Sequence, residues 1–261
     1  MPPAEGTELV GADSLNRKIP LHVATFNIAG GVGKDGKLDL ARTVAAVRGF
    51  DVVGVEEVHG SLIGELGNEI YGLGKESGLP LLFAPTERQW FHDSFGNGIL
   101  CDLRVTHWQR FPISTSASHS NRNLLLVDAI YFDKPLHILI THLDRHEDHD
   151  AELRTVISLF DDLSEPAILL GDLNTIASDP QLQALDSIPG VVNCLQAKLG
   201  DTIDASNVDW IYVRGLRCLN AGFSDNGASD HHLAWAELAP LNQDASPTPT
   251  TQPATLPSQV Q

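Results

Sequence analysis

Short apolar stretches, each about the length of a β-strand, recur along most of this sequence and are separated by polar clusters. Residues 21–28 alternate apolar side chains with small or polar ones before the Ala29-Gly30-Gly31 break. Alternation of this kind is typical of a half-buried strand that runs into a loop. The same reasoning predicts further strands at residues 51–55, 97–101, 124–132, 136–140, 167–170, 208–213 and 233–238.

Two segments between these strands have helical periodicity instead. Residues 38–48 are predicted to form a helix. Residues 151–163 are predicted to form an amphipathic helix with one apolar face, made by Leu153, Val156, Leu159 and Phe160. Polar residues of the kinds used in catalysis stand repeatedly where an apolar strand stops. Enzymes commonly build a site on rigid sheet ends and expose it in the loops, so this pattern favours an enzyme.

The composition indicates one folded domain with a tail at each end. A chain of 261 residues with 42% hydrophobic content can bury one large core. Residues 1–18 lack periodic apolar positions, and the C-terminal residues are rich in Pro, Thr and Gln with almost no apolar anchor. We therefore expect a flexible N-terminal tail at 1–18, a catalytic domain at 19–240 and a disordered C-terminal tail at 241–261.

The net charge and the cysteine content limit which binding partners and which cellular compartment we expect. The formal net charge of −17 argues against a protein that holds long nucleic acid by charge alone, because clustered Lys and Arg normally supply that binding. It leaves a nuclease open, because bound divalent cations add local positive charge. Cys101, Cys194 and Cys218 form neither a zinc-type pair nor a disulfide framework, which favours the cytoplasm and leaves secretion open. No apolar run is long enough for a transmembrane segment, and we expect a monomer.

The order of the polar motifs is more specific than any one of them, since an Asn after a strand is usually a turn residue and a lone His is usually structural. In chain order the motifs are Phe26-Asn27, Val55-Glu56-Glu57-Val58, Gly96-Asn97-Gly98, Thr141-His142-Leu143, Gly171-Asp172-Leu173-Asn174, Val208-Asp209-Trp210-Ile211 and Ser229-Asp230-His231. From about residue 20 to residue 238, the sequence resembles the exonuclease–endonuclease–phosphatase superfamily. That group includes pancreatic deoxyribonuclease, abasic-site endonucleases and neutral sphingomyelinases. The Gly-Asp-Leu-Asn turn and the terminal Ser-Asp-His are the most specific parts of the match.

The resemblance implies both a fold and a reaction. The fold would be of the α/β (α+β) class, a four-layer α/β/β/α sandwich of two mixed β-sheets flanked by helices, with the site at one edge. The reaction would be hydrolysis of phosphodiester bonds with Mg²⁺ or Mn²⁺ as cofactor. Hydrolysis requires neutralised charge on the phosphoryl oxygens, an activated water and a protected leaving oxygen, which a hard cation and oriented donors supply.

The resemblance also assigns metal ligands and residues that face the substrate. Asn27 and Glu57 match the residues that hold the metal, and Asp230 would lie beside it; oxygen ligands of this kind suit Mg²⁺. Asn97 and Arg122 would contact the substrate. The simpler alternatives are a turn residue between two glycines for Asn97 and a solvated charge for Arg122.

The implied catalytic residues are Asp172, Asn174, Asp209, His231 and His142. The Asp172 carboxylate would orient or deprotonate water, while the Asn174 amide would donate to a phosphoryl oxygen. His231 would act as a base or a charge stabiliser, with Asp209 fixing its tautomer. His142 would donate to the phosphate or assist the leaving group.

Two positions depart from the family pattern. Ala29 stands where abasic-site endonucleases have an additional acidic metal ligand, which makes that subfamily a poorer match. Glu56 stands where the family more often has Gln. We interpret Glu56 as a surface or hydrogen-bonding residue, with an additional acid behind the metal ligands as the alternative.

Other polar and aromatic segments invite functional hypotheses that a simpler interpretation outweighs. Residues 143–150 are dense in potential metal ligands, but a solvated loop with Asp150 as the N-cap of the next helix is favoured. Residues 87–92 and 107–111 interleave aromatic and basic side chains, as a base-stacking surface does. Aromatic residues of the core would give the same pattern and are favoured.

The substrate is the part of the function that the motifs determine least, because they handle the phosphate and not the groups attached to it. Nucleic acid is the expected substrate from the resemblance. A phospholipid headgroup, a nucleotide or an inositol phosphate is the alternative, favoured by the strong acidity of the chain. A non-catalytic binding protein on the same fold is the second alternative.

Overall fold

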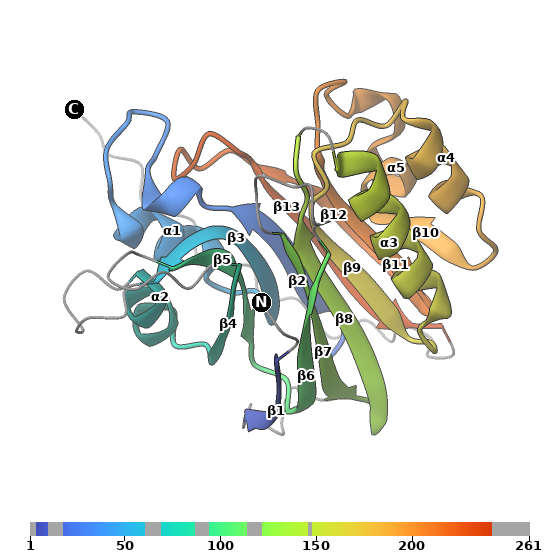
Figure 1. Ribbon diagram of the computed structural model, residues 1–261, viewed down its shortest axis with the longest axis horizontal. Helices are drawn as coiled ribbons and strands as arrows, with labels where there is room; N and C mark the ends of the chain where they lie inside the picture. Colours follow the sequence, from blue (N-terminus) through green and yellow to red (C-terminus); the bar gives the residue numbers. More distant parts are fainter. Residues whose placement is uncertain are drawn as a thin grey trace, which may run out of the picture.

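The described residues fold into two β-sheets that pack face to face, with helices on their outer sides (Figure 1). This computed structural model describes residues 4–9, 18–60, 69–86, 94–113, 122–145 and 148–241. The arrangement confirms the predicted α/β sandwich of two mixed sheets flanked by helices.

Each sheet combines parallel and antiparallel pairs among the described strands. The seven-stranded first sheet has the order β1 (Ala4–Leu9), β6 (Val105–Pro112), β7 (Asn123–Tyr131), β8 (Lys134–His142), β9 (Ala167–Asp172), β11 (Asp209–Arg214) and β10 (Val191–Asn193). The six-stranded second sheet has the order β12 (Leu216–Ser224), β13 (Leu233–Pro240), β2 (Leu21–Asn27), β3 (Val52–Gly60), β5 (Ser94–Cys101) and β4 (Leu81–Pro85). The parallel pairs are β8–β9 and β2–β3, so two strand ends in each sheet point the same way.

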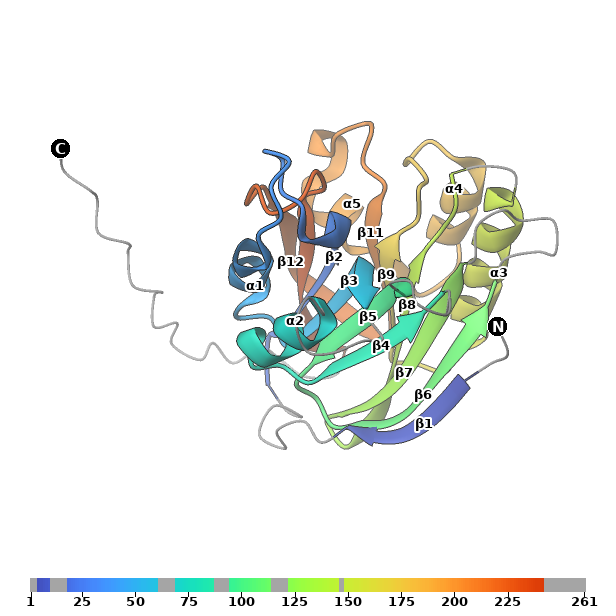
Figure 2. The same cartoon turned by 60° about the vertical axis from the view of Figure 1, so that its left-hand side comes forward.

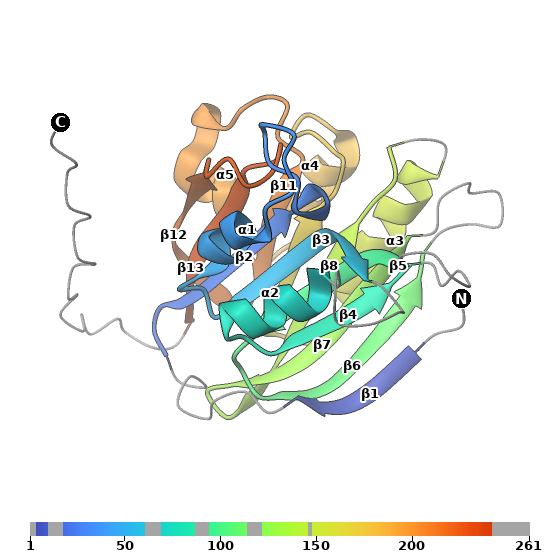
Figure 3. The same cartoon turned by 90° about the vertical axis from the view of Figure 1, so that its left-hand side faces the viewer.

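Helices close the sandwich from outside. Helices α1 (Leu40–Val47) and α2 (Glu69–Ser77) lie over the second sheet (Figure 3), while α3 (His149–Asp162) lies over the first. Helices α4 (Pro180–Asp186) and α5 (Cys194–Leu199) lie near β10 and β11, and the short 3-10 helices are η2 (Ala29–Gly31) and η3 (Gly200–Thr202). None of the described helices is long and apolar enough to cross a membrane.

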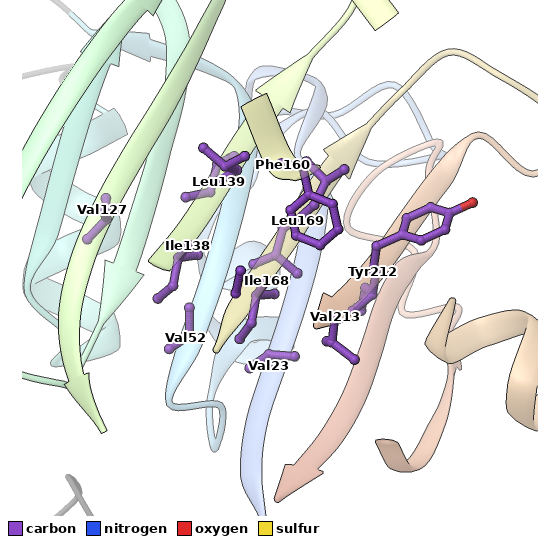
Figure 4. Packing of buried hydrophobic residues seen from close by; sticks show 14 of the residues in the cluster. Val23, Val52, Val127, Ile138, Leu139, Phe160, Ile168, Leu169, Tyr212 and Val213 are labelled. Atoms are coloured by element: carbon purple, nitrogen blue, oxygen red, sulfur yellow. The ribbon is translucent and has the colours of Figure 1, made fainter. Parts of the chain in front are cut away.

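Apolar side chains fill the space on both faces of the first sheet. Figure 4 shows Ile138 and Ile168 lying toward Val23 and Val52 of the second sheet. On the other face, Leu169 lies near Phe160 of α3. Because both faces of β8 and β9 are covered at this level, residues 138–140 and 167–170 are continuous apolar runs and do not alternate.

The N-terminal segment departs from the predicted flexible tail. Ala4–Leu9 form β1, which pairs antiparallel with β6 and lies at the edge of the first sheet (Figure 2). Backbone groups of an edge strand can pair with another segment without any apolar pattern in that segment, so the hydrophobic pattern did not predict this strand. Of the predicted C-terminal tail, residues 242–261 lie outside the described part of the chain.

Helix α3 and strand β3 begin or end differently from the predictions. Asp150 is not the N-cap of α3: the helix starts at His149 after Asp148, and Asp150 lies inside the first turn, where a carboxylate interacts favourably with the helix dipole. Strand β3 does not stop before Glu56 but continues to Gly60, with a register shift against β5 between Val55 and Val58.

The favoured interpretation of residues 107–111 as packing residues is confirmed. They lie in β6, and Trp108 and Phe111 pack against the core. Arg110 is buried and donates from Nη1 to the Pro85 carbonyl oxygen at 2.6 Å. Residues 87–92 lie outside the described part of the chain. All three cysteines are free thiols, as predicted.

Candidate active site

Strand register brings the polar motifs to one end of the sandwich. Asn27 ends β2, His142 ends β8 and Asp172 ends β9, and the two parallel pairs place these ends on the same side. His142 stands opposite Asp172, and Asp172 stands opposite Asp209, the first residue of the antiparallel strand β11. His231 joins them from the loop before β13.

Asp172 is the centre of this group. Its side chain is fully buried, and its Oδ1 accepts the backbone N–H of Asn174 at 2.9 Å. Its Oδ2 accepts from Nδ2 of Asn27 at 3.1 Å, which ties the two sheets together at this end. The same oxygen lies 3.5 Å from Nε2 of His142 and 3.8 Å from Nε2 of His231.

His231 and Asp209 form a short hydrogen-bonded pair, with 2.8 Å between Nδ1 and Oδ2. Burial alone would lower the pKa of His231, but the hydrogen bond and charge of Asp209, with the charge of Asp172, raise it to about 9. Burial raises the pKa of Asp209 to about 6, although its hydrogen bond to His231 acts in the opposite direction. The proton therefore stays on the imidazole at neutral pH, which favours the charge stabiliser over the base among the two predicted roles of His231.

The pKa of His142 is shifted in the opposite direction from that of His231. His142 is buried, and burial lowers its pKa to about 4, with Asp172 acting to raise it and Arg122 to lower it. Nη1 of Arg122 lies 3.3 Å from Nδ1 of His142. Because a guanidinium can only donate, Nδ1 must accept and the proton of the neutral ring is on Nε2. That N–H faces Asp172 and Glu57.

Glu57 and Asn27 lie on the second-sheet side of Asp172. Glu57 sits at the irregularity in β3 with a φ of 56°, and its Oε1 is 3.9 Å from Nε2 of His142. None of the described donors makes a hydrogen bond to its partly exposed carboxylate, so its oxygens are available to a cation. Asn27 Oδ1 accepts the Ala29 N–H at 3.1 Å and keeps a second lone pair.

Asp230 is exposed and accepts from the Ser229 hydroxyl at 3.2 Å. No contact joins Asp230 to Asn27 or Glu57 within the described residues. A second group, Asp172, Asp209 and His231, has potential ligand atoms within 4.8 Å of one another. That group includes a nitrogen ligand and is already hydrogen-bonded internally, whereas Mg²⁺ prefers oxygen ligands. The donor chemistry of Asn27 and Glu57 therefore fits the expected cation better.

The two residues predicted to face the substrate, Asn97 and Arg122, both make contacts within the protein. Asn97 is not a turn residue but a buried residue of β5, opposite Ala84, and its Nδ2 donates to the backbone and side-chain oxygens of Asn123 at 3.2 Å each. Arg122 contacts His142, as described above. The simpler interpretation of Asn97 is therefore wrong, and its contact with substrate stays a prediction.

Glu56 is buried, so its interpretation as a surface residue is wrong, whereas the hydrogen-bonding one is confirmed. Its Oε1 accepts from the Thr25 hydroxyl at 2.7 Å, and burial raises its pKa well above the usual value. A raised pKa favours the neutral carboxyl, which has the hydrogen-bonding groups of a Gln, the residue that the resembled family more often has here. Nothing in the strand pattern of the sequence identified Thr25 as its partner.

We expect Glu56→Gln to be tolerated and to stabilise the protein above about pH 4.5. A carboxyl with a raised folded-state pKa is most favourable to folding below its unfolded value of 4.5, and this contribution is lost as pH rises; the Gln variant has no such loss. Glu56→Ala should cost about 1–3 kcal/mol because the Thr25 hydroxyl loses its acceptor. Urea unfolding at several pH values measures both. A Gln variant that becomes less stable than the parent as pH rises would show that Glu56 is ionised.

A cleft of about 640 Å³ opens beside the His231–Asp209 pair. Its wall includes Asn174, Asp209, Asp230 and His231, together with Arg145, Thr202, Asp204, Ser206, Asn207, Val208, Phe223 and His232. This volume is in the range of small-molecule sites. Arg145 is exposed, as the interpretation of residues 143–150 as a solvated loop predicted. That interpretation did not predict the hydrogen bond from Arg145 Nε to Asn174 Oδ1, which is 2.9 Å long.

Comparison with known proteins agrees with this geometry. The model of the Endonuclease/Exonuclease/phosphatase family matches residues 24–231. No curated protein sequence matches the chain. An endonuclease/exonuclease/phosphatase from Beutenbergia cavernae DSM 12333 has a similar structure, with a TM-score of 0.72, 22% identity, and coverage of 85% of this chain and 72% of that one.

Two further solved structures share the fold at lower identity. D. rerio TDP2 complexed with single strand DNA product gives a TM-score of 0.61 at 18% identity, covering 84% of this chain and 98% of that one. The human Nocturnin catalytic domain with bound sulfate anion gives 0.63 at 14% identity, covering 85% and 94%. Identities this low show the fold alone. Because the family model matches most of its length, the chain belongs to the endonuclease/exonuclease/phosphatase family, whose members are generally phosphoesterases.

Proposed function

We propose that this protein hydrolyses phosphodiester bonds and that it requires Mg²⁺ or Mn²⁺. The convergence of Asp172 with Asn27, His142 and the His231–Asp209 pair carries this proposal. Asp209 and His231 also line the neighbouring cleft. The group supplies a buried carboxylate, a cationic donor and a neutral donor around one position. Phosphoester hydrolysis needs this combination for water activation and charge stabilisation.

The cation would be held by Asn27 and Glu57, with Asp230 as the third expected ligand. When bound, it supplies positive charge that stabilises the negative charge developing on the phosphoryl oxygens. The exposed oxygens of Glu57 and the remaining lone pair of Asn27 Oδ1 support this assignment.

The side chains of this protein would then handle the proton and the remaining charge. Asp172 would orient the attacking water and accept its proton. His231, held as an imidazolium by Asp209, would donate from Nε2 to a phosphoryl oxygen. His142 would keep its Nε2 proton and donate a hydrogen bond from it to the phosphate or the leaving oxygen, while Arg122 holds the ring.

Nucleic acid is the proposed substrate class. The bound single strand DNA product in the TDP2 structure is consistent with this proposal. A small phosphodiester, such as a nucleotide, a phospholipid headgroup or an inositol phosphate, is the second candidate. The acidic residues Asp204 and Asp230 on the cleft wall favour it, since carboxylates repel a polyanionic strand.

A substrate panel tests the function directly. Plasmid DNA, single-stranded DNA, RNA, sphingomyelin and small phosphate esters would each be incubated with the protein and Mg²⁺. Turnover of any phosphodiester supports the proposal, and the preferred ester identifies the substrate class. Absence of metal-dependent turnover on every ester would favour a binding protein on the same fold.

Removal of the cation with a chelator should abolish turnover. Glu57→Gln should weaken Mg²⁺ binding by about tenfold or more, because the substitution removes a charged oxygen ligand. Isothermal titration calorimetry measures the affinity. Glu237→Gln is a matched control: Glu237 has a similar side-chain exposure, 32% against 31% for Glu57, but lies beside His22 at the other end of β2. Equal Mg²⁺ affinity in the Glu57 variant and the parent would overturn the ligand assignment.

A further inference from the structure

Asn174 makes three hydrogen bonds within the protein, one through its backbone and two through its side chain. Its backbone N–H donates to Asp172 Oδ1 at 2.9 Å, its Nδ2 donates to the Leu143 carbonyl at 2.7 Å, and its Oδ1 accepts from Arg145 Nε at 2.9 Å. The donor at Arg145 and the acceptor at Leu143 permit only one orientation of the amide. Asn174 therefore links the loop after β9 to the loop after β8. It also accepts a hydrogen bond from Nε of the Arg145 guanidinium, which fixes the orientation of that group.

The backbone of the loop after β8 is pinned as well. The Leu143 N–H donates to the Asp172 carbonyl at 3.1 Å, and the Arg145 N–H donates to Asp144 Oδ1 at 2.6 Å. The Asp144 N–H in turn donates to Oε2 of the buried Glu152 in α3 at 2.8 Å. The stem of Arg145 is thus fixed relative to the catalytic carboxylate, although the side chain itself is exposed.

Arg145 keeps Nη1 and Nη2 available on the cleft side. It lines the cleft with His231, Asp209 and Asp230, and it forms no ion pair with a carboxylate of the described chain. Two other guanidiniums, those of Arg42 and Arg214, are instead paired with carboxylates. A guanidinium that is oriented by an amide and left without a carboxylate presents a planar fork suited to two oxygens of a phosphoryl group.

We propose that Arg145 is a substrate-binding residue whose Nη1 and Nη2 bind non-bridging oxygens of the substrate phosphoryl group at the mouth of the cleft. Asn174 is the positioning residue that holds it. This inference rests on the proposed phosphodiester hydrolysis, and it changes the role of Asn174, whose amide contacts Arg145 in place of the phosphate. It also explains how a chain with a net charge of −17 offers local positive charge to an anion.

The experiment measures anion binding separately from turnover. Inorganic phosphate is the probe, titrated into the full chain by calorimetry in the presence of a chelator, so that binding does not depend on the cation. Arg145→Gln should raise the Kd for phosphate by about 10-fold to 100-fold, as expected for loss of charge-assisted hydrogen bonds. Arg48→Ala is the control, because Arg48 is exposed beside His22 and away from the cleft, and it should leave the Kd unchanged.

Two further variants distinguish binding from positioning. Asn174→Ala should weaken phosphate binding nearly as much as Arg145→Gln, and the double variant should be no worse than Arg145→Gln, because the amide acts through the guanidinium. On the ester that the panel identifies, Arg145→Gln should raise KM by about tenfold and change kcat by less than about threefold. Circular dichroism confirms that each variant is folded.

The outcomes separate this inference from the proposed function. Unchanged phosphate affinity in Arg145→Gln overturns the inference, whether or not the protein turns over an ester. Additive losses in the double variant overturn the positioning role of Asn174. If phosphate binding depends on Arg145 but no phosphodiester is hydrolysed, the anion site stands and the proposed function fails.

Discussion

Replacing His231 with alanine should lower kcat for phosphodiester hydrolysis on the order of 10²–10⁴-fold, the typical loss for a positioned acid, base or oxyanion donor. The reason is the geometry around Asp172: the ring lies 3.8 Å from its Oδ2 and carries a proton that Asp209 holds in place at 2.8 Å. Steady-state kinetics on the ester that the panel identifies gives kcat. Substrate binding should change far less, because Arg145 and His142 are untouched.

The Asp209 variant tests whether the two residues act as one unit. Asp209→Ala should also lose most of the rate, and the double variant should be barely worse than His231→Ala alone, because groups that act together are not additive. Asp209→Asn is a second variant that is more certain to fold than Asp209→Ala, since it preserves the shape of the buried side chain. Multiplicative losses would mean that Asp209 does not work through His231, and near-parental turnover in His231→Ala would refute the mechanism.

Gly171→Ala should lower the free energy of unfolding by about 3 kcal/mol, at the upper end of what forced overpacking costs. A Cβ on Gly171 would overlap the carbonyl oxygen of Thr141 on the neighbouring parallel strand, and the φ of 156° is one that other residues rarely adopt. The strand cannot move away freely, because Asp172 next to it is bonded to Asn27 and Asn174. Urea unfolding measures the loss.

Gly72→Ala in α2 is the matched control for that substitution. Its added Cβ would meet nothing closer than Leu40 Cδ1 at 3.9 Å, and a helical alanine restricts the unfolded chain more than glycine does. It should therefore stabilise the protein by about 0.5 kcal/mol. If Gly171→Ala were as well tolerated as Gly72→Ala, the close approach of β8 and β9 at the Asp172 end would be wrong.

Strands that carry site residues could be predicted because a strand that is buried on both faces has a continuous apolar sequence. Residues 138–140 and 167–170 are apolar throughout, since one face packs on the second sheet and the other on α3. Polar motifs directly after such runs had to lie at strand ends. The parallel pairing of β8 with β9, which the sequence analysis did not predict, then brings His142 opposite Asp172.

Elements with weaker patterns were not predicted. Helices α2, α4 and α5 and strands β4, β6, β10 and β12 are absent from the sequence-based assignment. Strand β12 reads Leu-Arg-Cys-Leu-Asn-Ala-Gly-Phe-Ser, which does not alternate, because a register shift against β13 interrupts it. Helices α4 and α5 are only 7 and 6 residues long, too short for a helical period to be distinguished from chance.

By itself, the sequence determined which residue types stand at the strand ends and in what order, and that was enough for the fold, the family and the set of candidate residues. Only the tertiary structure decided what each residue does. His142 and His231 are the same residue type, yet burial beside Arg122 makes one neutral, and two carboxylates make the other cationic. Asn27 and Asn174 are likewise the same residue type. Asn27 donates to Asp172 across the two sheets, whereas Asn174 accepts from Arg145. The physical reason is that proton affinity and hydrogen-bond direction depend on neighbours such as Asp172, which is 145 positions from Asn27 along the chain.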